Sequence, residues 1–378
     1  MSRATLFIPP SPARAADLRK AYLAGDPSVT PVVERLVTES AELLAMRPPS
    51  VMDKAGTPPS GDKHDYMSLG TYWWPDPNTA DGLPYIRRDG ERNPETNSWD
   101  ITSIGDAGYG AVTLSLAYGV TGREEFAAKA AAFLRTWFLD EATRMNPHLE
   151  FGQAIPGRVT GRGIGIIDTR YLCGIWGSAK FLECSDAWTG EDRDKLRKWL
   201  GDYLEWLLTS AHGIDEAGQH NNHGMWYDVQ VVSFALNTGN ETVARDVLGK
   251  LAERRIFSQV AADGAQPHEL ARTLSVNYAT MNLNGMTLLA EAGKQLGMDI
   301  WGASGPEGQG IKRALEWTLP YAHNPAAWPS RQIKTPDWTN LAYPLFLGAR
   351  AYEEPRFAEA ARAALGDQAM TDRVNLYI

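Results

Sequence analysis

The chain has 378 residues, 43% of them hydrophobic, and a formal net charge of −9. This hydrophobic content can build a substantial core, while no apolar run approaches the roughly 18 residues of a membrane-spanning helix, so we expect no membrane insertion. The negative balance argues against nucleic acid as a partner, because like charges repel unless cations gather locally. No Ser/Gly-rich linker or charge block divides the sequence, which favours a single domain over residues 1–378.

The amino terminus contains a short apolar patch, Leu6-Phe7-Ile8, that Pro9 and Pro10 interrupt. A secretory signal has an apolar core of about 7 to 15 residues, so this patch is too short to be one. Either the protein is cytoplasmic or its secretion signal has already been removed.

The predicted elements are helices almost throughout. Apolar residues recur at helical spacing over residues 108–118, 126–138, 170–187, 191–211, 228–236, 243–261, 279–297 and 311–321. Thr189, three residues before Asp192, is typical of a capping box at the start of one of them. No window alternates with a period of two, so we predict an all-α protein of stacked helical hairpins, which could form a bundle, a solenoid or an (α/α) toroid.

Two cysteines, Cys173 and Cys184, lie eleven positions apart in the predicted helix 170–187. At about 1.5 Å per residue they would be roughly 16 Å apart, well beyond the limit of about 7 Å between disulfide-linked Cα atoms. We therefore expect both thiols to be free and buried.

Two long Gly/Pro-rich stretches, 52–99 and 146–168, interrupt the helices. Loops of this length in a compact domain are often functional. A local cluster of cations could let an acidic protein bind a polyanion, and the candidates are Lys54, Lys63, Arg87, Arg88, Arg158, Arg162 and Arg170.

The second half of the chain carries a set of chemically active residues. Asn222 and His223 stand side by side, and Arg272 precedes Tyr278 by six positions. An amide and a guanidinium can hold a carboxylate while an imidazole and a phenol move protons beside it, and a nearby cation makes the phenolate more accessible. Each residue also has a structural explanation: a helix cap for Asn222, a hydrogen-bonding role for His223, an ion pair with Glu269 for Arg272 and a core position for Tyr278.

Several segments continue this pattern toward the amino terminus. They are SGDKHDYMSL at 60–69, YWWPDP at 72–77, GLPYIRRDG at 82–90, QAIPG at 153–157 and GRGIGIIDT at 161–169. Together with the Asn-His and Arg-to-Tyr segments, they make the chain resemble the alginate lyase superfamily from about residue 50 to residue 285. Within it, the chain resembles most the alginate and glucuronan lyases grouped as polysaccharide lyase family 38.

This resemblance implies both a fold and a reaction. The fold is an (α/α) toroid, an incomplete barrel of six to seven helical hairpins with long active-site loops. The reaction is β-elimination in a β-1,4-linked polyuronate, with alginate the first candidate and glucuronan the second. Asn222 and Arg272 would neutralise the C5 carboxylate, and Tyr278 and His223 would act as acid and base. No metal or organic cofactor is implied, and a periplasmic or secreted location, with the signal removed, is expected.

The resemblance and the sugar-binding character of flat aromatic rings also give a predicted substrate-binding set. It comprises Lys63, His64, Tyr66, Trp73, Trp74, Arg88, Gln153, Arg162, Asn221, Trp226 and His268. Tyr227 is a further candidate for a sugar platform. Four tryptophans at helical spacing are expected in the core, namely Trp137, Trp188, Trp199 and Trp206.

Three other classes of protein remain as alternatives. A metallohydrolase could use His220, His223, His268 and Glu269 as ligands. An inverting glycoside hydrolase on an α/α barrel could use two carboxylates from Asp65, Asp168, Asp228 and Glu269. A non-catalytic carbohydrate-binding protein would explain the tryptophans but would leave His223 and Tyr278 without a role.

Overall fold

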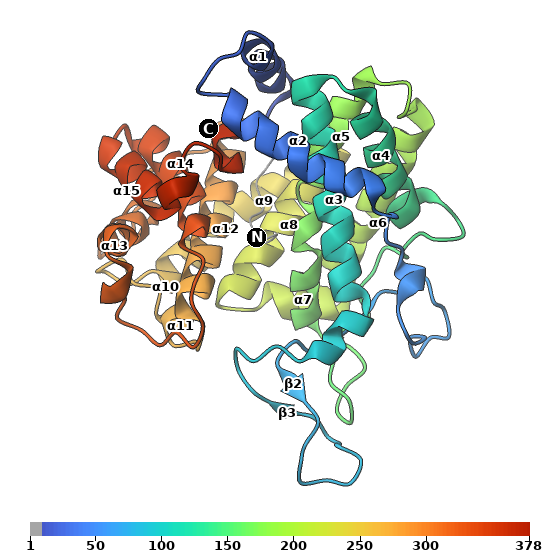
Figure 1. Cartoon of the computed structure of the whole chain (residues 1–378). Coiled ribbons are helices and arrows are strands. Elements are labelled where there is room, and N and C mark those ends of the chain that lie inside the picture. The colour runs from blue at the N-terminus through green and yellow to red at the C-terminus, as the bar shows by residue number, and fades with distance from the viewer. Residues whose placement is uncertain (1–9) are drawn as a thin grey trace. The chain divides into compact units, whose positions relative to one another are not determined.

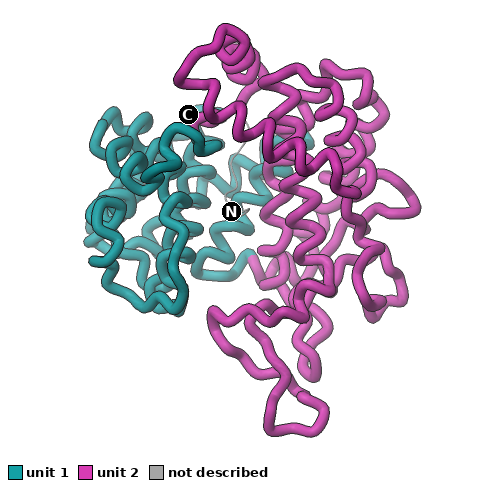
Figure 2. Tube along the Cα trace, viewed as in Figure 1, with its two compact units in different colours: residues 1–5, 217–374, 378 teal, residues 6–216, 375–377 magenta. Residues whose placement is uncertain are grey.

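Apolar residues at helical spacing form helices through most of residues 10–378, the part of the chain that this computed structural model describes (Figure 1). The apolar patch Leu6-Phe7-Ile8 lies outside the described residues. In that described part, no helix combines the length and the apolar character needed to cross a bilayer. The chain divides into two compact units, one made mainly of Ala217–Val374 and the other of the described residues up to Glu216 (Figure 2).

The first of these units in chain order is built around helix α3 (Asp100–Thr121), which packs against four other helices. These neighbours are α1 (Pro12–Leu23), α2 (Thr30–Ala45), α4 (Glu124–Leu134) and α5 (Ile175–Ala179). Helices α6 (Gly190–Thr209) and α7 (Ala211–Ala217) follow.

Four short strands lie in the two long loops of this unit, where the sequence predicted none. Strand β1 (Met67–Leu69) pairs in parallel with β4 (Phe151–Ala154) and so ties the two loops together. Strands β2 (Trp73–Trp74) and β3 (Ile86–Arg87) form an antiparallel hairpin that projects from the helices of the unit (Figure 1). With two to four residues each, these strands are too short to show a period of two.

The second unit is helical. Its elements are α8 (Asn222–Thr238), α9 (Glu241–Leu251), α10 (Phe257–Gln259), α11 (Pro267–Leu270), α12 (Ser275–Gln295), α13 (Ile311–His323), α14 (Ala342–Tyr352) and α15 (Pro355–Leu365). Helix α8 packs against α12, and a side-chain carbon at Gly285 would come within 2.7 Å of Met225 Cγ. Gly285 thus allows the helix that carries Asn222 and His223 to lie close to the helix that carries Tyr278.

Most of the predicted helices are confirmed, with one clear exception. The helix predicted over 191–211 is α6, and its capping box of Thr189 and Asp192 is present. The stretch 170–187 is not one helix but a succession of 3₁₀ and α turns. Apolar residues three apart fit either kind of turn, so the spacing could not separate them. Both cysteines are free as predicted, but only Cys173 is buried, and Cys184 is exposed.

Candidate active site

Helix α8 begins at the Asn-Asn-His segment. The Asn221 Oδ1 accepts a hydrogen bond from the His223 backbone nitrogen at 3.1 Å, which is the bond of an N-cap. Asn221, rather than Asn222, is therefore the capping residue. The side chain of Asn222, the first residue of the helix, has a different partner.

Glu269 on the short helix α11 holds both the backbone and the side chain of Asn222. Its two carboxylate oxygens accept from the Asn222 backbone nitrogen at 2.7 Å and from Nδ2 at 2.6 Å, and both residues are buried. Because a carboxylate only accepts, the amide nitrogen must face Glu269. Burial raises the pKa of Glu269, while the bonds from Asn222 and the nearby charges of His223 and Arg272 oppose this shift.

Arg272 and Tyr278 are in direct contact, as their spacing suggested. The Arg272 Nη2 donates to the Tyr278 hydroxyl at 3.0 Å, and the guanidinium carbon lies 4.0 Å from the centre of the phenol ring. Both side chains are half-buried. The hydroxyl accepts from a cation, so its own hydrogen can be donated, and the same guanidinium stabilises a phenolate.

Three histidines belong to this part of the chain. His223 lies in the first turn of α8 and is half-buried. His220 and His268 are exposed, and their rings meet edge to face with centroids 4.7 Å apart. Burial, and to a lesser extent the charge of His220, lowers the pKa of His268. Within residues 10–378, no group of three or more His, Cys, Asp and Glu side chains is arranged to hold a metal ion.

In the other unit, the β2–β3 hairpin places two half-buried tryptophans beside arginines. The guanidinium carbons of Arg158 and Arg162 lie 5.3 Å and 5.9 Å from the ring centre of Trp73, and that of Arg88 lies 5.2 Å from the ring centre of Trp74. A flat aromatic face next to a cation suits a sugar that carries a carboxylate.

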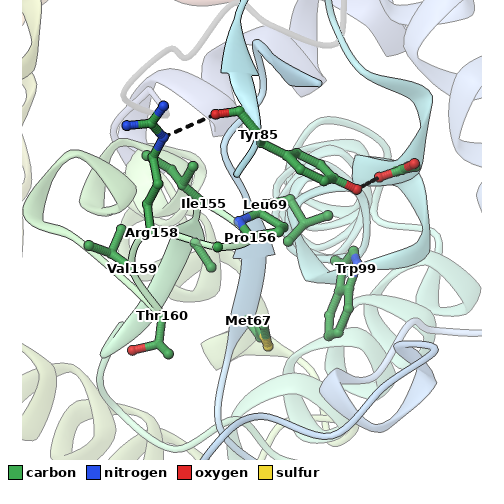
Figure 3. Close-up of a pocket in the computed structure, with 12 residues that line it drawn as sticks. Met67, Leu69, Tyr85, Trp99, Ile155, Pro156, Arg158, Val159 and Thr160 are labelled. Carbon is green, nitrogen blue, oxygen red and sulfur yellow. Dashed lines mark hydrogen bonds between the residues drawn. The ribbon is translucent and has the colours of Figure 1, made fainter. Parts of the chain in front are cut away.

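A cavity of about 630 Å³ lies beside this hairpin, within the same unit (Figure 3). Its walls are mainly apolar and include Met67 and Trp99. At its rim Arg158 Nε donates to the Tyr85 carbonyl at 3.0 Å, and the Tyr85 hydroxyl donates to Glu95 at 2.7 Å. Burial, helped by the bond to Glu95, raises the pKa of Tyr85 to about 12, so this phenol stays protonated.

Three members of the predicted substrate-binding set are internal and have structural roles. Tyr66 is fully buried, with its hydroxyl on Asp168 at 3.0 Å. The buried indole of Trp226 donates to the Met281 carbonyl at 3.0 Å. Gln153 is also buried, among hydrogen bonds described below. These side chains offer no open face to a sugar, and the same holds for Tyr227, which is 5% exposed.

Other predicted residues are anchored to the protein itself. The His64 Nδ1 donates to the Arg144 carbonyl at 2.7 Å, which fits the role of a loop anchor. Lys54, predicted to join the cation cluster, is buried with its Nζ 3.1 Å from Asp100, because a buried ammonium needs a counter-charge. Arg87 is exposed and forms an ion pair with Asp89 at 2.7 Å.

The remaining expectations concern tryptophans and carboxylates. Trp137, Trp188 and Trp199 are buried as predicted, but Trp206 is only half-buried, with its indole on Glu150. The four carboxylates that a glycoside hydrolase would need are all buried and hydrogen-bonded within the chain, namely Asp65, Asp168, Asp228 and Glu269. Their burial argues against that alternative.

Sequence reasoning missed the role of Glu269 as the partner that orients Asn222. The two residues are 47 positions apart, and nothing in the spacing of Pro267-His268-Glu269 identifies a partner so far away. It also missed the buried acceptor role of Asp168, although this residue lies in one of the quoted motifs.

Comparison with known proteins agrees with this fold. The family model for alginate lyase matches residues 50–328. An alginate lyase structure from Bacteroides ovatus is 38% identical, with 99% of each chain covered and a TM-score of 0.93. Two structures of alginate lyase A1-III, one from Sphingomonas species A1 and one of a variant in complex with a tetrasaccharide, are each 15% identical, with TM-scores of 0.53 and 0.59. They cover 88% and 98% of this chain and are themselves covered to 94% and 97%. A search of curated protein sequences gives no match.

The fold and the sequence together define a polysaccharide lyase with the helical toroid fold that the family resemblance implied. The chain belongs to the alginate lyase family.

Proposed function

We propose that the protein cleaves alginate by β-elimination, with the residues of α8, α11 and α12 as its catalytic set. The observation that carries this proposal is the direct bond between Arg272 and Tyr278, within the same unit as the oriented amide of Asn222. A carboxylate-binding pair next to a proton-transfer group is what removal of a proton beside a sugar carboxylate requires.

In the proposed reaction, Asn222 and Arg272 donate hydrogen bonds to the C5 carboxylate of a uronate. Neutralising this charge acidifies the C5–H bond and stabilises the enolate-like intermediate, and each oriented donor is worth roughly 3 to 4 kcal/mol. Tyr278 or His223 takes the C5 proton, the C4–O4 bond breaks, and Tyr278 gives a proton to O4. The products are a new hydroxyl end and a uronate with a double bond between C4 and C5.

The proposal extends to the substrate, the branch of the family, the location of the protein and the side chains that bind the polymer. Alginate is the first candidate substrate and glucuronan the second, and family 38 is the proposed branch. A periplasmic or secreted location fits a lyase that acts on a polymer. The proposed substrate-binding side chains are Lys63, Trp73, Trp74, Arg88, Arg162 and His268.

The test is to incubate the protein with sodium alginate and with glucuronan and to follow the ultraviolet absorbance of the unsaturated uronate. We expect this absorbance to rise together with the number of reducing ends. New reducing ends without ultraviolet absorbance would indicate a hydrolase, and binding without either signal would indicate a non-catalytic carbohydrate-binding protein. Activity that is lost with EDTA and restored by Zn²⁺ would favour the metal alternative instead.

A further inference from the structure

A buried carboxylate, Asp168, lies behind Arg162, one of the two arginines beside Trp73. Asp168 is 1% exposed and accepts three hydrogen bonds, from the Tyr66 hydroxyl at 3.0 Å, the Ser68 hydroxyl at 2.7 Å and the Gln153 Nε2 at 2.9 Å. All three partners are buried as well. Because a carboxylate only accepts, this arrangement fixes which end of the Gln153 amide faces Asp168.

Gln153 uses all four of its polar groups in this network. Its backbone nitrogen donates to Ser68 Oγ at 2.8 Å and its Nε2 donates to Asp168, while its carbonyl oxygen and its Oε1 both accept from Arg162, each at 3.0 Å. The backbone of Gln153 has a φ of 49°, a left-handed conformation that is uncommon for a residue other than glycine. Strain of this kind persists where the surroundings determine the conformation, and here it lets one residue face Asp168 and Arg162 together.

Arg162 is held by neutral acceptors only. Its Nε and Nη2 bind Gln153, and no carboxylate among the described residues forms an ion pair with it. A carbon at Gly70 would lie 3.1 Å from Arg162 Nη2 and 2.5 Å from the Trp73 ring, so glycine there allows the ring and the guanidinium to approach each other. Burial lowers the pKa of Arg162, and the charge of Asp168, acting from behind Gln153, opposes this shift.

We propose that Asp168 and Gln153 are positioning residues that hold Arg162 as a receptor for a carboxylate of the polyuronate. A direct Asp–Arg ion pair would fix the arginine equally well but would neutralise the charge that the substrate needs. The amide of Gln153 allows the arginine to be held in place while its charge is kept. Asp168 fixes the amide, and the amide fixes the guanidinium without cancelling its charge. Tyr66 and Ser68 complete the network by binding Asp168.

This inference rests on the proposed function, since a uronate polymer supplies the carboxylate. It moves Gln153 and Tyr66 from the predicted substrate contacts to a layer behind Arg162. It also gives Asp168 a role in substrate binding that needs no contact with the substrate.

The experiment compares Arg162→Ala, Gln153→Gly and Asp168→Asn with the wild-type enzyme on alginate. Glycine accepts a positive φ, so Gln153→Gly removes the side chain without adding backbone strain. We expect the KM of Arg162→Ala to rise at least about tenfold, the value for one lost charge-assisted contact, with kcat changed far less. Gln153→Gly and Asp168→Asn should raise KM in the same direction by several-fold. Arg123→Ala is the matched control, because Arg123 is exposed and paired with Glu125 on α4, and its KM should not change.

Ionic strength provides a readout that a merely structural role would not change. The KM of the wild type should rise with added NaCl, and that of Arg162→Ala should rise less, because the screened charge is gone. If Arg162→Ala keeps the wild-type KM and salt dependence, the inference is wrong. If circular dichroism shows that Asp168→Asn does not fold, the KM values of Arg162→Ala and Gln153→Gly still test whether Arg162 binds the substrate carboxylate and whether Gln153 positions it.

A failure of the proposed β-elimination can be distinguished from a failure of the inference about Arg162. Direct binding of alginate to each variant, measured by titration calorimetry, does not depend on turnover. If the wild type binds alginate but forms no unsaturated product, the proposed reaction fails while the role of Arg162 is still tested by the binding constants. Equal binding by wild type and Arg162→Ala would then overturn the inference on its own.

Discussion

Single charged neighbours set the geometry of both polar pairs in the proposed catalytic set. Glu269 orients the amide of Asn222. Arg272 lies over the ring of Tyr278 and donates a hydrogen bond to its hydroxyl. In each pair the neighbour fixes which hydrogen remains to be donated. Substitutions of these residues therefore separate orientation from chemistry.

Tyr278→Phe removes one hydroxyl and keeps the ring that lies against Arg272. We expect turnover on alginate to fall by about 10²- to 10⁴-fold, the usual contribution of a positioned acid or base. The circular dichroism spectrum should not change. Full activity in this variant would remove Tyr278 from the mechanism.

Arg272→Lys tests whether the guanidinium is needed as a planar donor. Arg272 gives one N–H to the Tyr278 hydroxyl from a planar fork of several N–H donors, a geometry that a single ammonium cannot match. We expect kcat/KM to fall by about 10²-fold or more, nearly as far as in Arg272→Ala. Wild-type kinetics in the lysine variant would show that only the charge matters.

His223→Ala addresses how the proton transfers are divided. In mannuronate and glucuronate the C5 hydrogen and O4 lie on the same face, so Tyr278 could act as both base and acid. In guluronate they lie on opposite faces, so a second group must take the proton, and His223 is the imidazole of the proposed catalytic set. We expect His223→Ala to lose guluronate cleavage more completely than mannuronate cleavage. Initial rates on block-pure polymers measure this, and equal fractional losses would mean that His223 only binds or orients the substrate.

At the scale of elements, the start of helix α6 shows how a local signal and a distant contact reinforce each other. Thr189 and Asp192 form the predicted capping box, and Arg135, at the end of α4, adds bonds of 3.0 Å and 2.6 Å to the same carboxylate. Burial acts to raise the pKa of Asp192, but the bonds from Arg135 and Thr189 outweigh it and lower the pKa to about 2. The cap therefore also joins two elements.

Asp192→Asn should lower the free energy of unfolding by about 1 to 2 kcal/mol at neutral pH, a range that allows for solvent screening of a partly exposed pair. Because the folded pKa lies below the ordinary value of 3.8, this stability is present above pH 4 and is lost as the pH falls toward 2. Urea denaturation at several pH values measures the difference. Asp194→Asn, at an exposed site on the same helix, is the control, and an equal loss in both variants would contradict the assignment.

The difference between local signals and distant contacts explains which elements the sequence could predict. Periodic apolar residues and the Thr189 cap are local signals, so α6, α12 and α13 were expected close to where they lie. The strands β1 and β4 depend on pairing between Met67 and Phe151, which are far apart in sequence, and no local pattern marks them. The proposed catalytic residues Asn222, His223, Arg272 and Tyr278 could be named from residue type, spacing and the family resemblance. The partners that orient them could not, because a hydrogen bond such as that from Asn222 to Glu269 depends on a tertiary contact between α8 and α11.

At the scale of the whole molecule, a formal charge of −9 opposes binding of a polyanion at long range. Attraction must come from local cations, and the structure removes Lys54 and Arg87 from that group because each has a carboxylate partner. Arg88, Arg158 and Arg162 remain beside Trp73 and Trp74. A short-range cationic site on an acidic protein favours recognition at contact over long-range steering.

The sequence suggested a single domain, whereas the structure has two compact units. The chain passes from one unit to the other between Glu216 and Ala217 and again after Val374, and both junctions lie inside helical segments, α7 and the 3₁₀ turn Arg373–Leu376. Independent domains are usually joined by exposed, flexible linkers, and a junction inside a helical segment is not such a linker. We therefore expect one heat-absorption peak in scanning calorimetry, with equal calorimetric and van't Hoff enthalpies. Two resolved peaks, or a folded fragment that survives limited proteolysis near residue 217, would show that the units fold separately.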